Sequence, residues 1–350
     1  MSSFREFLQT QSATFDEERG RVASFGSPHD EYRAVAAHDK AGVVPLLDTT
    51  PLRLSGADRA DFLHGQISNE VRRLAVHAGV TALMLNHKGH ALALLRVYRR
   101  DEDLFVAVEA GAGETVEAQL TRHIIFDQVT VTNLDDTIVS LSVQGGAAAD
   151  VVGAVFGVPH SDLPRGEVFT HYPFADAKVL VAPVARSVAG GFDLHVLARD
   201  AAALCTKLSE AGAVLVGQEG LELARVEAGL PSAATEAGPG VLPQEVGLEP
   251  AISYRKGCYL GQEIMARIEA RGNVRNQLAG VSLEKMPTET TLTQNGKKVG
   301  ELKTVVEHPD LGVIALAKLK TDVVAGSELF AGEVRAKSRA LPFRGSPQPA

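Results

Sequence analysis

Several residue types that mark particular classes of protein are scarce in this chain of 350 residues. Tryptophan is absent and aromatic residues make up 5% of the chain, which leaves few flat surfaces for stacking single-stranded nucleic acid. The only cysteines, Cys205 and Cys258, show no CxxC spacing, so a disulfide framework is excluded and a self-contained zinc site is not expected. This cysteine usage fits a reducing compartment.

Positive charge and long apolar runs are also scarce. The formal net charge is -8, whereas nucleic-acid binding usually needs a basic face, so we expect no stable nucleic-acid binding outside a local basic pocket. No apolar run approaches the roughly 20 residues that span a bilayer. Residues 1–20 lack the apolar core of a signal peptide and carry four acidic residues. We therefore expect a cytoplasmic protein that does not bind membranes.

The helix and strand signals predict an α+β protein with an internal duplication. A chain of this length and 45% hydrophobic content is expected to form two or three domains. Two successive units of similar order suggest antiparallel sheets that carry helices on one face. The predicted organisation is an N-terminal extension (1–45), a first α+β half (46–135), a second half (136–215), a linking segment (216–276), an antiparallel β-barrel (277–342) and a tail (343–350). Residues 345–350 of this tail are expected to be disordered.

Particular elements within these units are predicted from local signals. Ser55 is a good N-cap for a helix over 57–74. The alternating runs 80–85 and 91–98, joined by a turn that contains Gly89, predict a hairpin. A helix over 219–230 is expected to end at its glycine and proline. We also expect a strand near 167–171.

The densest group of reactive side chains lies in KGCYLGQE, residues 256–263. Two glycines within it allow a tight turn or a close approach to a ligand. A cation such as Lys256 favours the thiolate form of Cys258, and the thiolate is the nucleophilic and metal-binding form. The alternative is a buried cysteine that acts as a small hydrophobic residue. Sequence chemistry alone leaves both interpretations open.

Glu227 stands near the end of its predicted helix, where an acidic side chain is electrostatically disfavoured. The usual outcome for such a carboxylate is solvation. The alternative is that it accepts two parallel hydrogen bonds from an amidine-like ligand edge, such as that of a pterin ring. Arg225 is two positions away and is expected to point to a different face of the helix.

Arg267, Arg271 and Arg275 recur at every fourth position behind the KGCYLGQE stretch. Gly272-Asn273 predicts a turn that interrupts them, so they form a solvated basic loop or, alternatively, bind an acidic ligand such as a glutamate tail. No P-loop, GxSxG or HExxH motif is present. Three histidines without the spacing of a metal site are expected on the surface or in loops: His64, His87 and His90.

The KGCYLGQE stretch resembles the signature of the YgfZ family, folate-binding proteins of iron–sulfur cluster assembly that are linked to tRNA modification. That family is similar in fold to the glycine-cleavage T protein, an aminomethyltransferase. The resemblance continues in Arg225–Pro231, in Leu242–Ser253, in His64–Glu70 and in the hairpin turn Leu85–Gly89. It covers about residues 45–335.

The resemblance implies two ferredoxin-like folate-domain halves and a C-terminal β-barrel around a central tetrahydrofolate site. The implied partners are folate and iron–sulfur assembly factors or client iron–sulfur enzymes. No intrinsic metal site is implied, and Cys258 becomes the functional thiol and a candidate transient iron–sulfur ligand. The residues implied to surround the thiol or the folate are Lys256, Glu227, Arg225, Tyr259, Gln262, Glu263, Asn86 and Arg267.

One departure from the T protein bears on the reaction. The T protein carries an acidic pair after the hairpin, where this chain has Ala93 and Leu94. Because an acid–base group for aminomethyl transfer is then missing, glycine-cleavage activity is not expected. A folate-dependent one-carbon transferase or demethylase acting on an amine is the alternative function, and a thiol hydrolase that pairs Cys258 with a distant histidine is the third.

Overall fold

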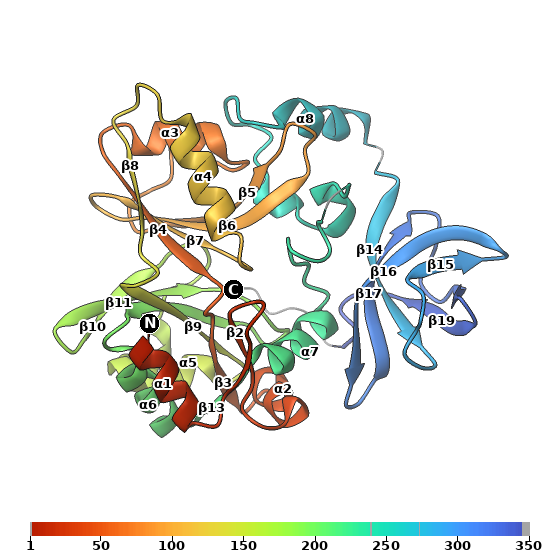
Figure 1. Cartoon of the computed structure of the whole chain (residues 1–350), viewed down its shortest axis with the longest axis horizontal. Helices are drawn as coiled ribbons and strands as arrows, with labels where there is room; N and C mark the ends of the chain where they lie inside the picture. Colours follow the sequence, from red (N-terminus) through yellow and green to blue (C-terminus); the bar gives the residue numbers. More distant parts are fainter. Residues whose placement is uncertain (1, 239, 273, 345–350) are drawn as a thin grey trace.

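The computed structural model describes residues 2–238, 240–272 and 274–344 (Figure 1). A five-stranded sheet and a six-stranded sheet lie next to each other, and a closed barrel of six strands lies at the other side of the molecule. A short ribbon of β1 (Thr14–Asp16) and β2 (Arg21–Ser24) completes the sheets. The predicted α+β class with a C-terminal antiparallel β-barrel is confirmed. Residues 345–350 of the predicted tail lie outside the described residues.

The five-stranded sheet has the order β5-β6-β7-β4-β8. Its strands are β4 (Thr50–Ser55), β5 (Gly79–Leu85), β6 (Ala91–Arg99), β7 (Leu104–Val108) and β8 (Thr130–Asn133). Apolar side chains of α3 (Arg59–Gln66) and α4 (Gly113–His123) join its core. The predicted hairpin is present as β5 and β6, and Gly89 has the positive φ of 77° that the turn requires.

The helix that was expected over 57–74 is shorter than predicted. It begins after Asp58 rather than at Ser55, and Ile67 beyond its last residue already has an extended conformation. Tertiary hydrogen bonds replace the next helical turn, because the Ser68 hydroxyl donates to the Ala251 carbonyl and accepts from the Leu83 amide. A distant partner therefore overrides the local helical pattern.

The six-stranded sheet has the order β10-β11-β12-β9-β3-β13. Its strands are β3 (Ala41–Pro45), β9 (Ile138–Gln144), β10 (Thr170–Phe174), β11 (Ala177–Pro183), β12 (Gly191–Leu197) and β13 (Ala213–Leu215). Its core includes residues of α1 (Ser2–Thr10), α5 (Ala148–Phe156) and α6 (Ala201–Glu210). The strand expected at 167–171 begins only at residue 170. Residues 41–45, expected in an N-terminal extension, lie within this sheet.

The remaining elements connect the sheets to the barrel. Helix α2 (Pro28–Ala36) packs against α7 (Gln218–Ala228), which ends at Gly229 as predicted. Two short 3-10 helices, η2 (Pro243–Val246) and η3 (Glu249–Ala251), precede α8 (Gln262–Arg271). The barrel strands are β14 (Asn276–Leu283), β15 (Thr291–Gln294), β16 (Lys297–His308), β17 (Gly312–Lys320), β18 (Glu328–Ala331) and β19 (Val334–Arg339).

Across the described ranges, every helix is too short or too polar to span a lipid bilayer.

Candidate functional site

A cavity of about 360 Å³ lies between the two sheets and the linking segment. Its lining combines apolar side chains with a few polar ones, among them Thr81, Arg96, Tyr98, Val184 and Leu248. A smaller cavity of about 130 Å³ shares four lining residues with it. The shared residues are Arg96, Ala185, Leu230 and Pro231. The two cavities therefore adjoin, and we call them the central cavity and the polar cavity.

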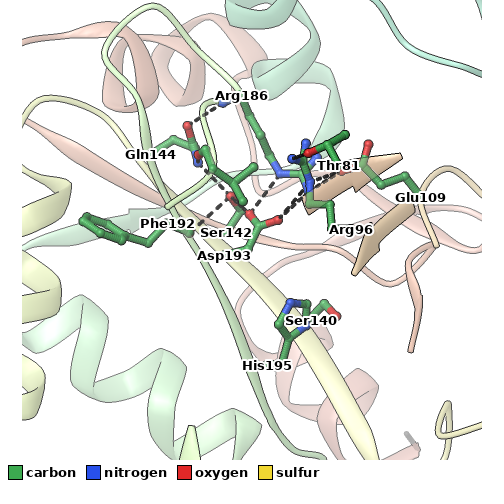
Figure 2. Close-up of polar contacts among 11 residues, drawn as sticks. Thr81, Arg96, Glu109, Ser140, Ser142, Gln144, Arg186, Phe192, Asp193 and His195 are labelled. Atoms are coloured by element: carbon green, nitrogen blue, oxygen red, sulfur yellow. Dashed lines mark hydrogen bonds and ion pairs between the residues drawn. The ribbon is translucent and has the colours of Figure 1, made fainter. Parts of the chain in front are cut away.

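Four charged residues link the two sheets beside these cavities (Figure 2). Arg96 of β6 donates through Nε to Glu109 Oε1 at 2.8 Å, and Arg186 Nη2 reaches the same oxygen at 2.8 Å. Arg186 also binds Asp193 of β12 with two hydrogen bonds, Nε to Oδ1 at 3.0 Å and Nη2 to Oδ2 at 2.6 Å. We call Arg96, Glu109, Arg186 and Asp193 the polar network.

The charges in the polar network stabilise one another. Burial by itself raises the pKa of Glu109, but the charges of Arg186 and Arg96 outweigh it and hold that pKa below its usual range. Burial also raises the pKa of Asp193, but the neighbouring cations, chiefly Arg186, outweigh burial and lower that pKa. Both carboxylates are therefore ionised at neutral pH, as expected for acids paired with guanidinium groups.

Neutral polar groups extend the network within the six-stranded sheet (Figure 2). Ser142 donates to Asp193 Oδ1 at 2.7 Å, and Gln144 Oε1 accepts from the Arg186 amide at 2.9 Å. Nearby, His195 Nδ1 lies 2.8 Å from the Ser140 hydroxyl oxygen, and burial lowers the pKa of His195 to about 4. This histidine is therefore neutral.

Sequence reasoning missed the polar network because its members come from four separate segments. The available signal was a charged residue inside an otherwise apolar strand, as with Arg96 in ALALLRVY and Asp193 in GFDLHVL. Buried charges of this kind require partners. The sequence alone does not show which partners are used.

The KGCYLGQE stretch leads into the N-terminus of α8, and Cys258 within it is exposed. Lys256 is buried, and its ammonium donates to the main-chain carbonyls of His64, Ile67 at 2.6 Å and Asn69 at 3.0 Å. Burial lowers the pKa of Lys256 to about 8. The ammonium thus connects residues 256–261, here called the cysteine loop, to the end of α3 and to the segment that follows it.

The other predicted residues of this stretch have structural contacts. Tyr259 is buried with its ring centroid 4.8 Å from Lys256 Nζ, and burial raises its pKa to about 12. Gln262 Nε2 lies 3.5 Å from the Lys256 carbonyl. Glu263 and Arg267 form an exposed pair at 2.7 Å on α8. Arg267 also lines a surface cleft with Arg275.

The hairpin turn and the cysteine loop lie in contact. Asn86 Oδ1 accepts from the amides of Lys88 and His90, so this side chain holds the turn. Gly261 has φ +85°, and a Cβ there would lie 2.9 Å from the Asn86 carbonyl oxygen. This close approach requires glycine at position 261.

The prediction that His64 is a surface or loop histidine is wrong. The residue is 4% exposed, and its Nδ1 lies 3.1 Å from Glu70 Oε1. Its Nε2 faces the cysteine loop, 3.6 Å from the position that a Cβ on Gly257 would occupy. Burial and the charge of Lys256 lower the pKa of His64. The packing of α3 buries this side chain. A single histidine in the sequence does not indicate such packing.

Glu227 is 4% exposed, so its interpretation as a solvated acid is wrong. It accepts a hydrogen bond of 2.9 Å from the Tyr32 hydroxyl, and Arg344 Nε lies 4.0 Å from its other oxygen. Burial raises its pKa, against the opposing effect of Tyr32 and Arg344. It lines a different cavity, of about 770 Å³, which also includes Asp310.

Arg225 points away from Glu227, as predicted. It pairs with Glu222 at 2.7 Å and with the buried Glu236 at 2.8 Å. It lines the polar cavity, whereas Glu227 does not. The two residues, which the resemblance had placed together around the thiol or the folate, therefore line different cavities.

Within the described ranges, no group of three or more His, Cys, Asp or Glu side chains could hold a metal ion.

Comparisons with known proteins agree with this architecture. An aminomethyltransferase of Exiguobacterium sibiricum is 28% identical, over 90% of this chain and 88% of its own. The tRNA-modifying protein YgfZ of Yersinia enterocolitica is 27% identical, over 82% of this chain and 87% of its own. The crystal structure of the glycine cleavage system aminomethyltransferase T from Bartonella henselae superposes with a TM-score of 0.85 at 20% identity, over 97% of this chain and 96% of that one. The fold is thus the aminomethyltransferase fold.

The sequence also matches the GCVT N-terminal domain family over residues 5–256, most of the chain. Together with the YgfZ relatives, this match confirms the resemblance read from KGCYLGQE. The chain belongs to the GCVT N-terminal domain family, as a YgfZ-type member of the superfamily that includes the aminomethyltransferases.

Proposed function

We propose that this protein binds tetrahydrofolate in the central cavity and supports iron–sulfur proteins through the thiol of Cys258. The observation that carries the proposal is the connection between the cavity and the cysteine loop. Asn69 lines the central cavity, and its carbonyl accepts a hydrogen bond from Lys256, two residues before the thiol. A ligand in the cavity and the exposed thiol are therefore connected through Asn69 and Lys256.

The dimensions and lining of the cavity suit a folate. Small-molecule sites are typically clefts of ~300–1,000 Å³ with apolar walls and a few polar groups, and the central cavity has about 360 Å³. Leu94, Val184 and Leu248 offer apolar surface to an aromatic ring, while Arg96 offers hydrogen-bond donors. These features support folate as the ligand.

The region after the hairpin supports an accessory role rather than glycine cleavage. Ala93 and Leu94 are buried in β6, and Leu94 lines the central cavity. No carboxylate stands at these two positions to act as an acid or base. Client proteins in this proposal are iron–sulfur enzymes, among them those that modify tRNA.

Folate binding is tested by calorimetric titration of tetrahydrofolate into the wild type and Val168→Trp. Val168 lines the central cavity and is 50% exposed, so an indole there occupies cavity space without entering the core. We expect at least tenfold weaker binding. Val214→Trp is the matched control, because Val214 is also 50% exposed and belongs to the edge strand β13. Absence of tetrahydrofolate binding by the wild type would refute the proposal.

The thiol role is tested by Cys258→Ala in cells that lack the wild-type protein. We expect loss of support for iron–sulfur enzyme activity, with folate affinity unchanged. Cys205→Ala is the control, because Cys205 is buried in α6 and burial raises its pKa to about 12, so it does not supply a thiolate. Full support by Cys258→Ala would remove the thiol from the function.

A folate-dependent one-carbon transferase acting on an amine is the second candidate. It is favoured by relatives named aminomethyltransferase that align over nearly their whole length. The test is incubation with tetrahydrofolate and candidate amines, with detection of a one-carbon folate product. Turnover that persists in Cys258→Ala would favour the transferase over the accessory role.

A further inference from the structure

Two loops from different halves of the molecule meet beside the central cavity. One is the turn of residues 75–78 before β5, and the other is the loop of residues 165–168 before β10. Ala78 and Val168 form an isolated antiparallel bridge between them. Gly79 from the first side and residues 166–168 from the second line the central cavity. We call this contact the clasp.

Few interactions hold the clasp together. The Gly79 amide donates to the Glu167 carbonyl at 2.6 Å, and the Phe169 amide donates to the His77 carbonyl at 3.1 Å. The side chains of Arg165 and Glu167 are exposed, and neither forms a hydrogen bond or an ion pair with another described residue. On its other side, β5 pairs with β6 along its whole length. Opening of the clasp therefore breaks two main-chain hydrogen bonds and leaves the sheet intact.

The loop of residues 165–168 is anchored at both ends, which confines its motion to a short stretch. Leu163 and Pro164 before it are buried, and Phe169 after it packs with its ring centroid 5.5 Å from that of Tyr98. All four residues between these anchors are exposed. Gly166 has a φ of +63°, and a Cβ there would have no other atom within 4 Å. This position therefore has both the conformational freedom and the space to turn.

Another wall of the central cavity, formed by the linking segment, is held more firmly. Pro250 and Ala251 line the cavity there. The Ser68 hydroxyl donates to the Ala251 carbonyl at 2.6 Å, and the Ser68 carbonyl accepts from the Ser253 amide at 2.9 Å. Asn69 Nδ2 also lies 3.3 Å from the Pro250 carbonyl oxygen. Because segments with few buried contacts and exposed hydrogen bonds open first, the clasp opens before this wall does.

We propose that the clasp is the gate of the central cavity. The loop of residues 165–168 moves away from β5 to admit the ligand, and it returns when the cavity is filled. A bound ligand contacts the lining residues of this loop and therefore stabilises the closed position, as with other loops that cover binding sites. The inference rests on the proposed folate function and adds to it the route by which the ligand enters and leaves.

A reversible disulfide across the clasp tests this gate. The two hydrogen bonds of the clasp belong to the residues on either side of Ala78 and Val168, so these two residues exchange none between themselves. Antiparallel positions of this kind bring their side chains closest together. Ala78→Cys with Val168→Cys therefore locks the clasp on oxidation, and a reductant releases it. Mass spectrometry verifies that the disulfide forms.

The new cysteine pair is introduced into protein that carries Cys258→Ala, so that no other exposed cysteine competes. The Cys258→Ala protein is the reference. Glu328→Cys with Lys337→Cys in the same background is the matched control, because these exposed residues face each other on β18 and β19 of the barrel. Surface plasmon resonance in anaerobic buffer without reductant measures the association and dissociation rates of tetrahydrofolate.

With the clasp locked in the empty protein, we expect tetrahydrofolate to associate at least about tenfold more slowly than in the reference. When the disulfide is formed after the ligand has bound, dissociation should slow by a similar factor. Reduction should restore both rates, and the barrel disulfide should change neither. Association and dissociation rates equal to those of the reference in the oxidised protein would overturn the inference.

Hydrogen exchange tests the opening without any ligand. The amides of Gly79 and Phe169 lose their partners when the clasp opens, so they should exchange at least about tenfold faster than the paired amides in the middle of β6. Equal protection of the two groups would overturn the inference. This measurement does not depend on the proposed function, which would instead be refuted by wild-type protein that binds no tetrahydrofolate.

Discussion

The polar network and the cysteine loop both hold charged side chains away from water, but they stabilise those charges differently. The network balances two guanidinium groups with two carboxylates, and its four members come from one strand of each sheet and from two loops. The cysteine loop depends on one buried ammonium whose partners are main-chain carbonyls from one short segment. The first arrangement neutralises charge and joins distant parts of the chain. The second fixes one end of a loop and leaves its thiol exposed.

This difference suits two separate tasks. A cavity wall that must recognise a ligand gains from side chains that are positioned before the ligand binds. A thiol that must meet another protein gains from exposure. The comparison therefore predicts that damage to the network reduces stability throughout the fold, whereas damage to the loop remains local.

Replacement of Arg186 should give the largest effect. Arg186→Met leaves Asp193 and Glu109 without their shared cation, and breaking a buried pair from one side costs about 3–5 kcal/mol. The free energy of unfolding from urea denaturation at pH 7 measures this loss. Arg199→Met is the control, because Arg199 forms an exposed pair with Asp176 that should contribute less than about 1 kcal/mol. Similar decreases in the free energy of unfolding of the two variants would contradict the claim that the buried pair contributes more than the exposed one.

Acid should weaken the region beside the network through His195. Burial holds the pKa of His195 at about 4, whereas an unfolded histidine titrates near ~6.5. Between these values the unfolded state binds the extra proton, so stability is full above pH 6.5 and falls as the pH drops to 4, by up to about 3 kcal/mol.

Thermal unfolding of the wild type and His195→Phe across this pH range isolates the contribution of the histidine. The phenyl ring suits the neighbouring Tyr98 and Phe105 rings. We expect the thermal stability of the variant to decrease less than that of the wild type as the pH is lowered. The same dependence of thermal stability on pH in both proteins would assign that dependence to other groups.

Replacement of Lys256 should give the smallest and most local effect. Lys256→Met removes the donor shared by three carbonyls, which should cost about 1–3 kcal/mol. Hydrogen exchange should accelerate at residues 64–70 and 256–261 while the strands that carry the network stay protected. Lys207→Met on the exposed surface of α6 is the control. Uniformly faster exchange would show that the loop supports the whole fold.

The sequence predicted those features that depend on neighbouring residues. The β5–β6 hairpin follows from alternation around a glycine turn, and the end of α7 follows from Gly229. The cysteine motif could be recognised because its residues are contiguous. The length of α3 was wrong because Ser68 forms hydrogen bonds with residues far away in sequence.

Most of the candidate binding site could not be predicted from the sequence. Arg96 and Asp193 are nearly a hundred positions apart, and neither belongs to a motif. Glu227 stood out because acids are disfavoured at the C-terminal ends of helices, but its carboxylate contacts Tyr32 and lines another cavity. A pattern can indicate that a charge needs a partner, whereas only the tertiary structure supplies that partner.

The position of β3 has a consequence for the order of events during synthesis. This strand pairs with β9 in the six-stranded sheet, yet every strand of the five-stranded sheet lies between them in sequence. As the chain emerges from the ribosome, β4 to β8 can form their own sheet while β3 is still unpaired, because β9 has not yet been synthesised. Its parallel neighbour β13 arrives later still. Pairing of distant strands is slow, and unpaired strand edges promote aggregation. Early folding of the inserted sheet shortens the flexible chain between β3 and β9. It thereby limits the time for which β3 is exposed.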